Sequence, residues 1–292
     1  MEPEPDLASS IEVRAGDCAA DPEPREPPHP RVRVYPGFAS RVLGNERAIS
    51  VYVPPGYDED RRAYPLLVMQ DGQNLFDPAT SFIRGKTWRM AEHADAAIEA
   101  GEVEPLVIAG VANAGERRMA EYTPVRDWKL GGGDAAQYAA MIVEELLPFL
   151  HAEYRLLSGP SASGRPHTGL GGSSLGGLVS LWTGLRRPDV FGRLAVLSPS
   201  VWWNHRYIVR YVDDVAAEVQ PRPRIWLDAG EREGRRTLAD AEMLQARLLR
   251  HGWREGADLQ FETIAGGTHD EASWAERVRP MLRFLFPARS EK

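Results

Sequence analysis

The sequence predicts an α/β protein with a mostly parallel central sheet and helices on both faces. From about residue 32, short apolar runs alternate with helix-like segments, which is typical of that architecture. A Gly-x-Ser-x-Gly pentad at residues 172–176 stands between an apolar run and an apolar helix-like segment. Because ligands of parallel sheets bind beyond the carboxyl ends of the strands, we expect the functional residues to follow predicted strands.

The predicted strands share short runs of apolar residues that end at Gly, Pro or a polar loop. They lie at residues 48–53, 66–70, 106–111, 194–197, 224–227 and 259–264. The predicted helices have apolar residues at helical spacing and lie at residues 87–101, 134–154, 175–185, 237–251 and 271–286. We expect Asp134 to cap the second of these helices and Pro148 to kink it.

Composition and net charge argue against several classes of binding site. The chain has 292 residues and a net charge of −7, which argues against a broad basic surface for nucleic acid or an anionic membrane. Its single cysteine, Cys18, excludes an intramolecular disulfide and a cysteine-rich metal site. We expect neither a metal nor an organic cofactor, and a small molecule as the partner.

The first 30 residues differ in composition from the rest of the sequence. Residues 1–30 are acidic, rich in proline and poor in large apolar groups, so we expect a disordered tail there. We assign residues 31–289 to one catalytic domain. The tail lacks the basic start and apolar core of a secretory signal, and no apolar run approaches the roughly 18 residues that span a membrane. The expected location is the cytoplasm.

The pentad predicts a nucleophile. A serine hydroxyl reacts efficiently only when it is exposed, held rigidly and paired with a base. A sharp strand-to-helix turn would expose Ser174, and the small residues Gly172 and Gly176 lie two positions before and after it. In α/β-hydrolases, which carry their nucleophile on such a turn, the acid follows the nucleophile along the chain and the base comes last. His269, in a Gly-containing loop before the last helix, is the best base, although it could instead cap that helix. His205 and His251 also lie downstream.

The acid must follow a strand between Ser174 and His269. Asp228, Glu231 and Glu233 are the candidates, and Glu233 is favoured because it lies beyond the turn at Gly230. We expect at least two of the three to be solvated loop charges. The oxyanion donors are expected to be the backbone N–H groups of Leu175, after the nucleophile, and Gln73, after an early strand.

Several longer segments resemble the putative-esterase family of α/β-hydrolases, which includes enterochelin-type trilactone esterases, feruloyl esterases and S-formylglutathione hydrolases. The matching segments lie at residues 51–57, 71–77, 118–124, 172–178, 198–203 and 269–274. The resemblance implies an α/β-hydrolase fold, with Ser174 as nucleophile, His269 as base and an acid at Glu233. Many relatives carry Asp at that position, and some trilactone esterases work with a Ser–His pair.

The resemblance also implies a substrate cleft and a reaction. Arg118, Trp202 and Trp203 fall in family segments near that cleft, although core packing is an equal reading for the two tryptophans. The expected activity is hydrolysis of carboxylic esters, including siderophore trilactones, through an acyl-enzyme. An acyltransferase with the same triad and a non-catalytic binding protein on the same fold are the alternatives. The ester and the oligomeric state stay open.

Overall fold

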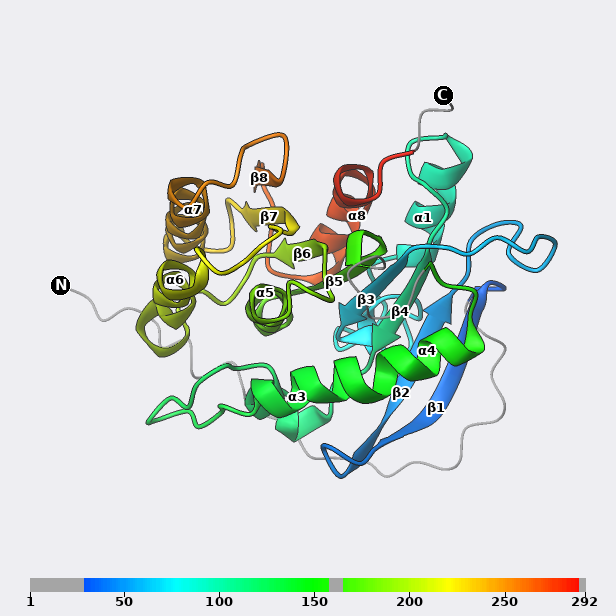
Figure 1. Cartoon of the computed structure of the whole chain (residues 1–292), viewed down its shortest axis with the longest axis horizontal. Helices are drawn as coiled ribbons and strands as arrows, with labels where there is room; N and C mark the ends of the chain where they lie inside the picture. Colours follow the sequence, from blue (N-terminus) through cyan, green and yellow to red (C-terminus); the bar gives the residue numbers. More distant parts are fainter. Residues whose placement is uncertain (1–28, 158–164, 289–292) are drawn as a thin grey trace.

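A central sheet of eight strands forms the middle layer of the computed structural model, which describes residues 29–157 and 165–288 (Figure 1). The strands are β1 (Val32–Ser40), β2 (Asn45–Tyr52), β3 (Leu66–Gln70), β4 (Val107–Val111), β5 (Thr168–Ser173), β6 (Arg193–Leu197), β7 (Arg224–Gly230) and β8 (Leu259–Ile264). Their order across the sheet is β1-β2-β4-β3-β5-β6-β7-β8. The pairs β1–β2 and β2–β4 are antiparallel and the others are parallel, which confirms the predicted mostly parallel α/β-hydrolase fold.

Both faces of the sheet are buried, and strand β3 shows how. Side chains alternate between the faces of a strand, so Leu66 and Val68 join one apolar cluster while Leu67 and Met69 join the other. All five residues of β3 are buried. This is why the strand is continuously apolar in sequence and could be recognised there.

Helices cover the two faces unequally. Helices α1 (Met90–Glu99) and α8 (Glu271–Leu285) pack together over one face, above the sheet in Figure 1. Helices α3 (Ala135–Met141), α4 (Leu147–Glu153), α5 (Leu175–Arg186) and α6 (Trp203–Val215) contribute to the cluster on the other face. Helix α7 (Arg235–Arg250) packs against α6 and β7. Strand β5 lies between β3 and β6 in the sheet, and α5 packs against β5 and β6.

The predicted helix 134–154 differs from expectation in two details. A π-helical turn, Ile142–Leu146, joins α3 to α4 and takes the place of a sharp kink at Pro148. Proline has no N–H to donate, and the wider turn just before it accommodates that loss. The Asp134 side chain makes no capping hydrogen bond; it lies 3.5 Å from the Arg117 guanidinium instead.

Strand β1 and helix α6 are among the elements that were not predicted. Strand β1 contains Pro36 and Gly37, where its register against β2 shifts, so its apolar alternation is interrupted. Helix α6 begins with three residues in left-handed conformation, at positions 204–206, which no helical pattern indicates. Of the expected tail, residues 1–28 lie outside the described residues, and His29 lies 3.2 Å from the Asp95 carboxylate.

Candidate active site

Ser174 occupies a sharp turn between β5 and α5. Its backbone has φ 56° and ψ −123°, a strained conformation for a residue with a side chain. The turn is anchored at both ends, because Ser174 N–H donates to Leu197 O at 3.0 Å and Leu178 N–H donates to Ser174 O at 3.1 Å. The Ser174 side chain is half-buried. This is the geometry that exposes a serine hydroxyl at the carboxyl edge of the sheet.

The two glycines of the pentad are required by close packing against β3. A Cβ atom added to Gly172 would lie 2.8 Å from Gln70 Cβ, and one added to Gly176 would lie 3.0 Å from the same atom. Real Cβ atoms rarely approach that closely, so neither position has room for a side chain. The sharp turn at Ser174 thus depends on the bare backbone two residues before and after it.

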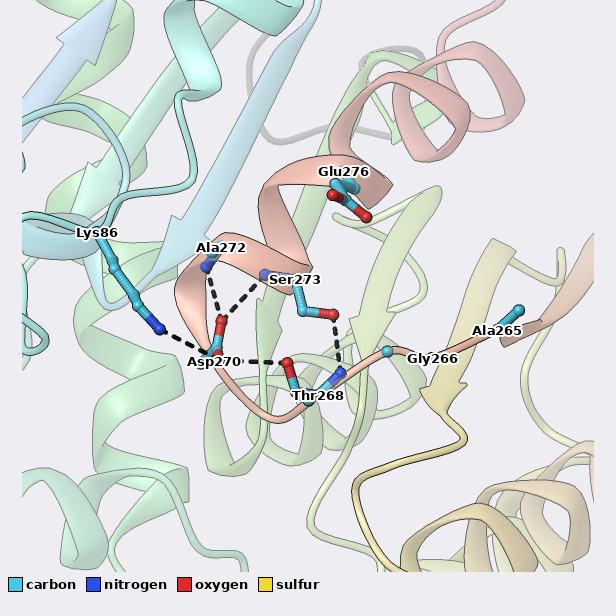
Figure 2. A pocket seen from close by; sticks show the side chains of 9 residues that line it. Lys86, Ala265, Gly266, Thr268, Asp270, Ala272, Ser273 and Glu276 are labelled. Atoms are coloured by element: carbon cyan, nitrogen blue, oxygen red, sulfur yellow. Dashed lines mark hydrogen bonds and ion pairs between the residues drawn. The ribbon is translucent and has the colours of Figure 1, made fainter.

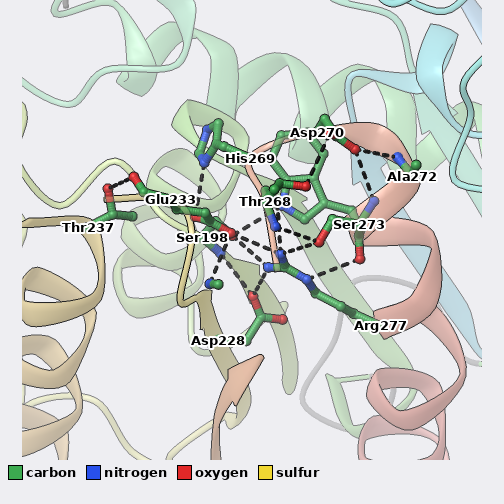
Figure 3. Close-up of polar contacts among 12 residues, drawn as sticks. Ser198, Asp228, Glu233, Thr237, Thr268, His269, Asp270, Ala272, Ser273 and Arg277 are labelled. Atoms are coloured by element: carbon green, nitrogen blue, oxygen red, sulfur yellow. Dashed lines mark hydrogen bonds and ion pairs between the residues drawn. The ribbon is translucent and has the colours of Figure 1, made fainter. Parts of the chain in front are cut away.

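His269 and Glu233 form an acid–base pair. His269 Nδ1 lies 3.0 Å from Glu233 Oε2, and 41% of the His269 side chain is exposed while that of Glu233 is fully buried. A carboxylate can only accept a hydrogen bond, so Nδ1 carries the proton and Nε2 of the neutral ring keeps its lone pair. The imidazole ring also packs edge-on against Trp274, with ring centroids 4.9 Å apart. Figure 3 shows this pair with its neighbours.

His269, Glu233 and the alternatives to them make different contacts. Asp270, rather than His269, caps α8 and accepts hydrogen bonds from the N–H groups of Ala272 and Ser273. His251 Nε2 lies 2.8 Å from Asp213, at the end of α7. Glu231 is exposed and accepts from Gly266 N–H at 3.0 Å. Among the acid candidates, Glu233 is therefore the one that contacts His269.

Asp228 is not a solvated charge, contrary to the expectation that two of the three carboxylates would be. It is fully buried within β7, and Arg277 Nη1 donates to its Oδ1 at 2.7 Å. The same guanidinium donates from Nη2 to Glu233 Oε1 at 2.9 Å, so one buried arginine bridges two buried carboxylates. Sequence reasoning missed Arg277. The available signal was its place on the apolar face of α8, between Trp274 and Met281.

These contacts set the ionisation of the two carboxyls. Burial alone would raise the pKa of Glu233, but hydrogen bonds from His269, Ser198 and Arg277 outweigh it and hold the pKa below its usual range. For Asp228, burial dominates over the attraction of Arg277 and raises the pKa. Glu233 therefore stays ionised well into the acid range.

A short segment between β6 and α6 joins the nucleophile to the acid. Ser200 Oγ lies 3.2 Å from Ser174 Oγ, and Ser198 Oγ donates to Glu233 Oε1 at 2.6 Å. Among the described residues, Ser174 Oγ is hydrogen-bonded to Ser200 and not to His269. Contacts between nucleophile and base are often long without substrate. The three residues are thus gathered at one edge of the sheet but not yet in a continuous hydrogen-bonded chain.

The expected oxyanion donors follow the ends of two neighbouring strands, β5 and β3. Leu175 is the first residue of α5, where N–H groups have no intrahelical acceptor. Gln73 lies in the 3₁₀ turn η2 (Gly72–Asn74), directly after β3, and its side chain accepts from Asn113 N–H at 3.2 Å. A Cβ on Gly176 would lie 3.3 Å from Asp71 Oδ2, so this loop lies against the start of α5.

The three residues expected at a substrate cleft have different surroundings. Arg118 binds Asp71 through two hydrogen bonds of 2.8 Å each, and 29% of its side chain is exposed. Trp202 is 41% exposed. Trp203 is 1% exposed and its indole donates to Val125 O at 2.8 Å, so it packs in the core and cannot contact a substrate. Core packing was the correct reading for this residue.

A comparison with family models covers the part of the chain that carries these residues. Residues 40–285 match the model described as "Putative esterase", which is most of the chain. The chain belongs to this esterase family. Its membership agrees with the fold and supports carboxylic-ester hydrolysis as its activity.

Named relatives of this esterase-family chain include uncharacterised proteins and siderophore esterases. The protein YbbA of Bacillus subtilis is 24% identical over 86% of this chain and 96% of its own length. The iron(III) salmochelin esterase of Escherichia coli and the iron(III) enterobactin esterase of Dickeya dadantii are each 27% identical, over 80% and 85% of this chain. The chain spans only 53% of the length of each of these two esterases.

Solved structures show the same fold. The BES protein of Bacillus cereus superposes with a TM-score of 0.73 at 21% identity, covering 92% of this chain and 99% of that one. The enterobactin esterase of Shigella flexneri superposes with a TM-score of 0.63 at 21% identity, covering 87% of this chain and 59% of that one. The α/β-hydrolase fold of this family member is therefore shared with both.

The surface next to the site is hollowed. A shallow hollow of about 240 Å³ lies beside the loop that carries His269, and Lys86 and Asp270 line it 3.5 Å apart (Figure 2). Ser174 does not line this hollow.

Within residues 29–157 and 165–288, no helix is long and apolar enough to cross a membrane.

Proposed function

We propose that this chain is a cytoplasmic serine carboxylic-ester hydrolase that acts through an acyl-enzyme, with its catalytic domain at residues 31–289. The observation that carries the proposal is the 3.0 Å contact between His269 Nδ1 and buried Glu233, at the sheet edge where Ser174 occupies its strained turn. A nucleophile, a base and an acid that orients the base are the parts that acyl transfer needs.

The proposed reaction has two stages. Ser174 Oγ attacks the ester carbonyl while His269 Nε2 takes its proton, and the N–H groups of Gln73 and Leu175 stabilise the oxyanion. His269 then returns the proton to the departing alcohol, which leaves an ester on Ser174. Water, activated by His269, hydrolyses that ester and restores the free hydroxyl. Glu233 holds the imidazole in the required tautomer and stabilises its cation throughout.

The proposed substrate is a small-molecule ester, with siderophore trilactones as the first candidates. Relatives named as salmochelin, enterobactin and ferri-bacillibactin esterases support this choice at 24–27% identity. The exposed Trp202 offers an aromatic surface next to the segment that carries Ser200, and Arg118 offers a partly exposed guanidinium. These two residues are the proposed substrate contacts.

The catalytic roles are tested by hydrolysis of p-nitrophenyl acetate. We expect Ser174→Ala and His269→Asn to lower kcat by several orders of magnitude, on the order of 10³ or more. His251→Asn is the matched control, because His251 also faces a carboxylate, 2.8 Å away, but lies at the end of α7. Full activity of the Ser174 variant, or failure of a fluorophosphonate probe to label the wild type at Ser174, would refute the mechanism.

The substrate is tested separately with an ester panel. Ferric and metal-free trilactone siderophores, feruloyl esters and short acyl esters are compared by kcat/KM, with acceptor alcohols added in parallel to detect acyl transfer. We expect the highest kcat/KM for a trilactone. A preference for short acyl esters would refute the trilactone assignment while leaving the serine mechanism intact.

A further inference from the structure

Glu271 is a buried carboxyl close to the proposed catalytic groups. It is the first residue of α8, two positions after His269, and only 3% of it is exposed. Its Oε1 accepts a hydrogen bond from Asn74 Nδ2 at 3.2 Å, and its buried Oε2 has no hydrogen-bond partner among the described residues. A buried carboxyl with one unpaired oxygen lowers the stability of the fold. The presence of Glu271 at this position therefore requires an explanation.

Asn74 is the residue that follows Gln73, the proposed oxyanion donor. Its side-chain oxygen accepts from Phe82 N–H at 2.9 Å, which fixes the orientation of the amide and turns its NH₂ group toward Glu271. Its backbone oxygen accepts from Thr87 Oγ1 at 2.7 Å and from Trp88 N–H at 3.0 Å. Asn74 thus organises the loop between η2 and α1, and Glu271 connects that loop to α8.

A second contact joins the same two segments at the surface. Lys86 Nζ lies 3.5 Å from Asp270 Oδ2, and Figure 2 shows Lys86 extending toward the start of α8. The Lys86 side chain is 44% exposed, so water and salt screen this pair. The buried contact between Asn74 and Glu271 is not screened in this way. The two contacts therefore provide a matched pair, one buried and one exposed.

We propose that Glu271 is a positioning residue that fixes the loop of the oxyanion donor Gln73 relative to the base His269. The inference rests on the proposed function, since it assigns Glu271 a role in the same reaction. Oxyanion donors act only when they point at the position of the developing charge, and a loop that shifts by about 1 Å loses much of this effect. The hydrogen bond from Asn74 keeps the two segments in register before substrate arrives.

Two substitutions of Glu271 differ in whether they keep this contact. Burial, together with the nearby carboxylates of Asp270 and Asp71, raises the pKa of Glu271 above its usual value. Either protonation state of the carboxyl can accept from Asn74, and glutamine supplies the same acceptor oxygen without a charge. Leucine has a similar volume but no acceptor, so the pair of variants separates the hydrogen bond from packing.

The test compares Glu271→Gln, Glu271→Leu and Lys86→Ala by kcat and KM for p-nitrophenyl acetate, with folding checked by circular dichroism. We expect Glu271→Leu to lower kcat by about 10–100-fold with KM changed less than about threefold, since the loss lies in the transition state. Glu271→Gln and Lys86→Ala should keep kcat within about threefold. If Glu271→Leu does not fold, Asn74→Ala removes the same hydrogen bond and should show the same loss.

Three results would overturn the inference: a folded leucine variant with wild-type kcat, a glutamine variant as impaired as the leucine variant, or a Lys86 variant with the same loss. Ser174→Ala is measured alongside. If that variant is inactive while Glu271→Leu is fully active, only the positioning role fails. If Ser174→Ala is fully active, both the proposed function and the inference fail.

Discussion

Arg277 Nη2 lies 2.9 Å from Glu233 Oε1, and this buried ion pair leaves the other oxygen of Glu233 to face His269. The arginine is 1% exposed and also donates to Asp228, Ser198 and Thr268 (Figure 3). Because these contacts come from two strand ends and the base loop, Arg277 fixes the position of the acid. The carboxylate cannot rotate away from His269 without breaking several hydrogen bonds.

Removing this arginine is expected to destabilise the fold. Arg277→Met leaves two buried carboxylates without their counter-charge, and breaking a buried pair in this way costs about 3–5 kcal/mol. Urea unfolding measures the loss. Arg279→Met, two residues further along α8, removes a surface pair with Glu102 and should leave the unfolding midpoint almost unchanged. Equal shifts for both variants would contradict the bridging role.

The low pKa of Glu233 predicts a pH dependence of stability. Because the pKa is lower in the folded than in the unfolded chain, the contribution of Glu233 is fully present above its unfolded value, about 4.3, and is lost as the pH falls through the folded value. We expect the difference in unfolding free energy between wild type and Glu233→Gln to shrink below about pH 4.3. A difference that stays constant down to about pH 3 would contradict this.

The close packing of the pentad predicts that Gly172 cannot be replaced. In Gly172→Ala the new methyl group would lie 2.8 Å from Gln70 Cβ, and such overpacking costs about 1–3 kcal/mol. Because the strand end would shift, activity toward p-nitrophenyl acetate should fall as well. Gly37→Ala is the control, since a Cβ there would lie 3.5 Å from Glu46 Oε2, at ordinary contact distance. Thermal unfolding of both variants gives the comparison.

The two adjacent tryptophans should respond differently to truncation. Trp203→Ala removes a ring that is 1% exposed, and loss of a buried tryptophan costs about 3–5 kcal/mol. Trp202 is 41% exposed, so Trp202→Ala should leave stability within about 1 kcal/mol and instead raise KM for an aromatic ester. Urea unfolding and steady-state kinetics separate the two effects. A large loss of stability on truncating Trp202 would contradict this assignment.

Local patterns were sufficient for much of the fold. Strand β3 is apolar throughout because both faces of it are covered, and the glycines around Ser174 indicate a turn because no side chain fits there. Strand β1 was missed because Pro36 and Gly37 interrupt its alternation. Elements whose pattern is set by residues adjacent in sequence could therefore be predicted.

The site depended more on contacts that no local pattern encodes. The order of the chain placed Ser174, Glu233 and His269 at strand ends, and the structure brings His269 and Glu233 together. Arg277 is 44 residues from Glu233 in sequence, and its place on the apolar face of α8 indicates burial but not its partners. The burial of Asp228 and Trp203 likewise follows from long-range packing, so sequence alone left their surroundings open.

The bridging arginine also has a consequence for charge balance. Asp228 and Glu233 share the guanidinium of Arg277, and Glu233 stays ionised because its pKa is lowered. In the proposed reaction, proton uptake by His269 brings a second cation to Glu233, 3.0 Å from its Oε2. The transferred proton therefore arrives beside a negative charge that is in place before the reaction begins.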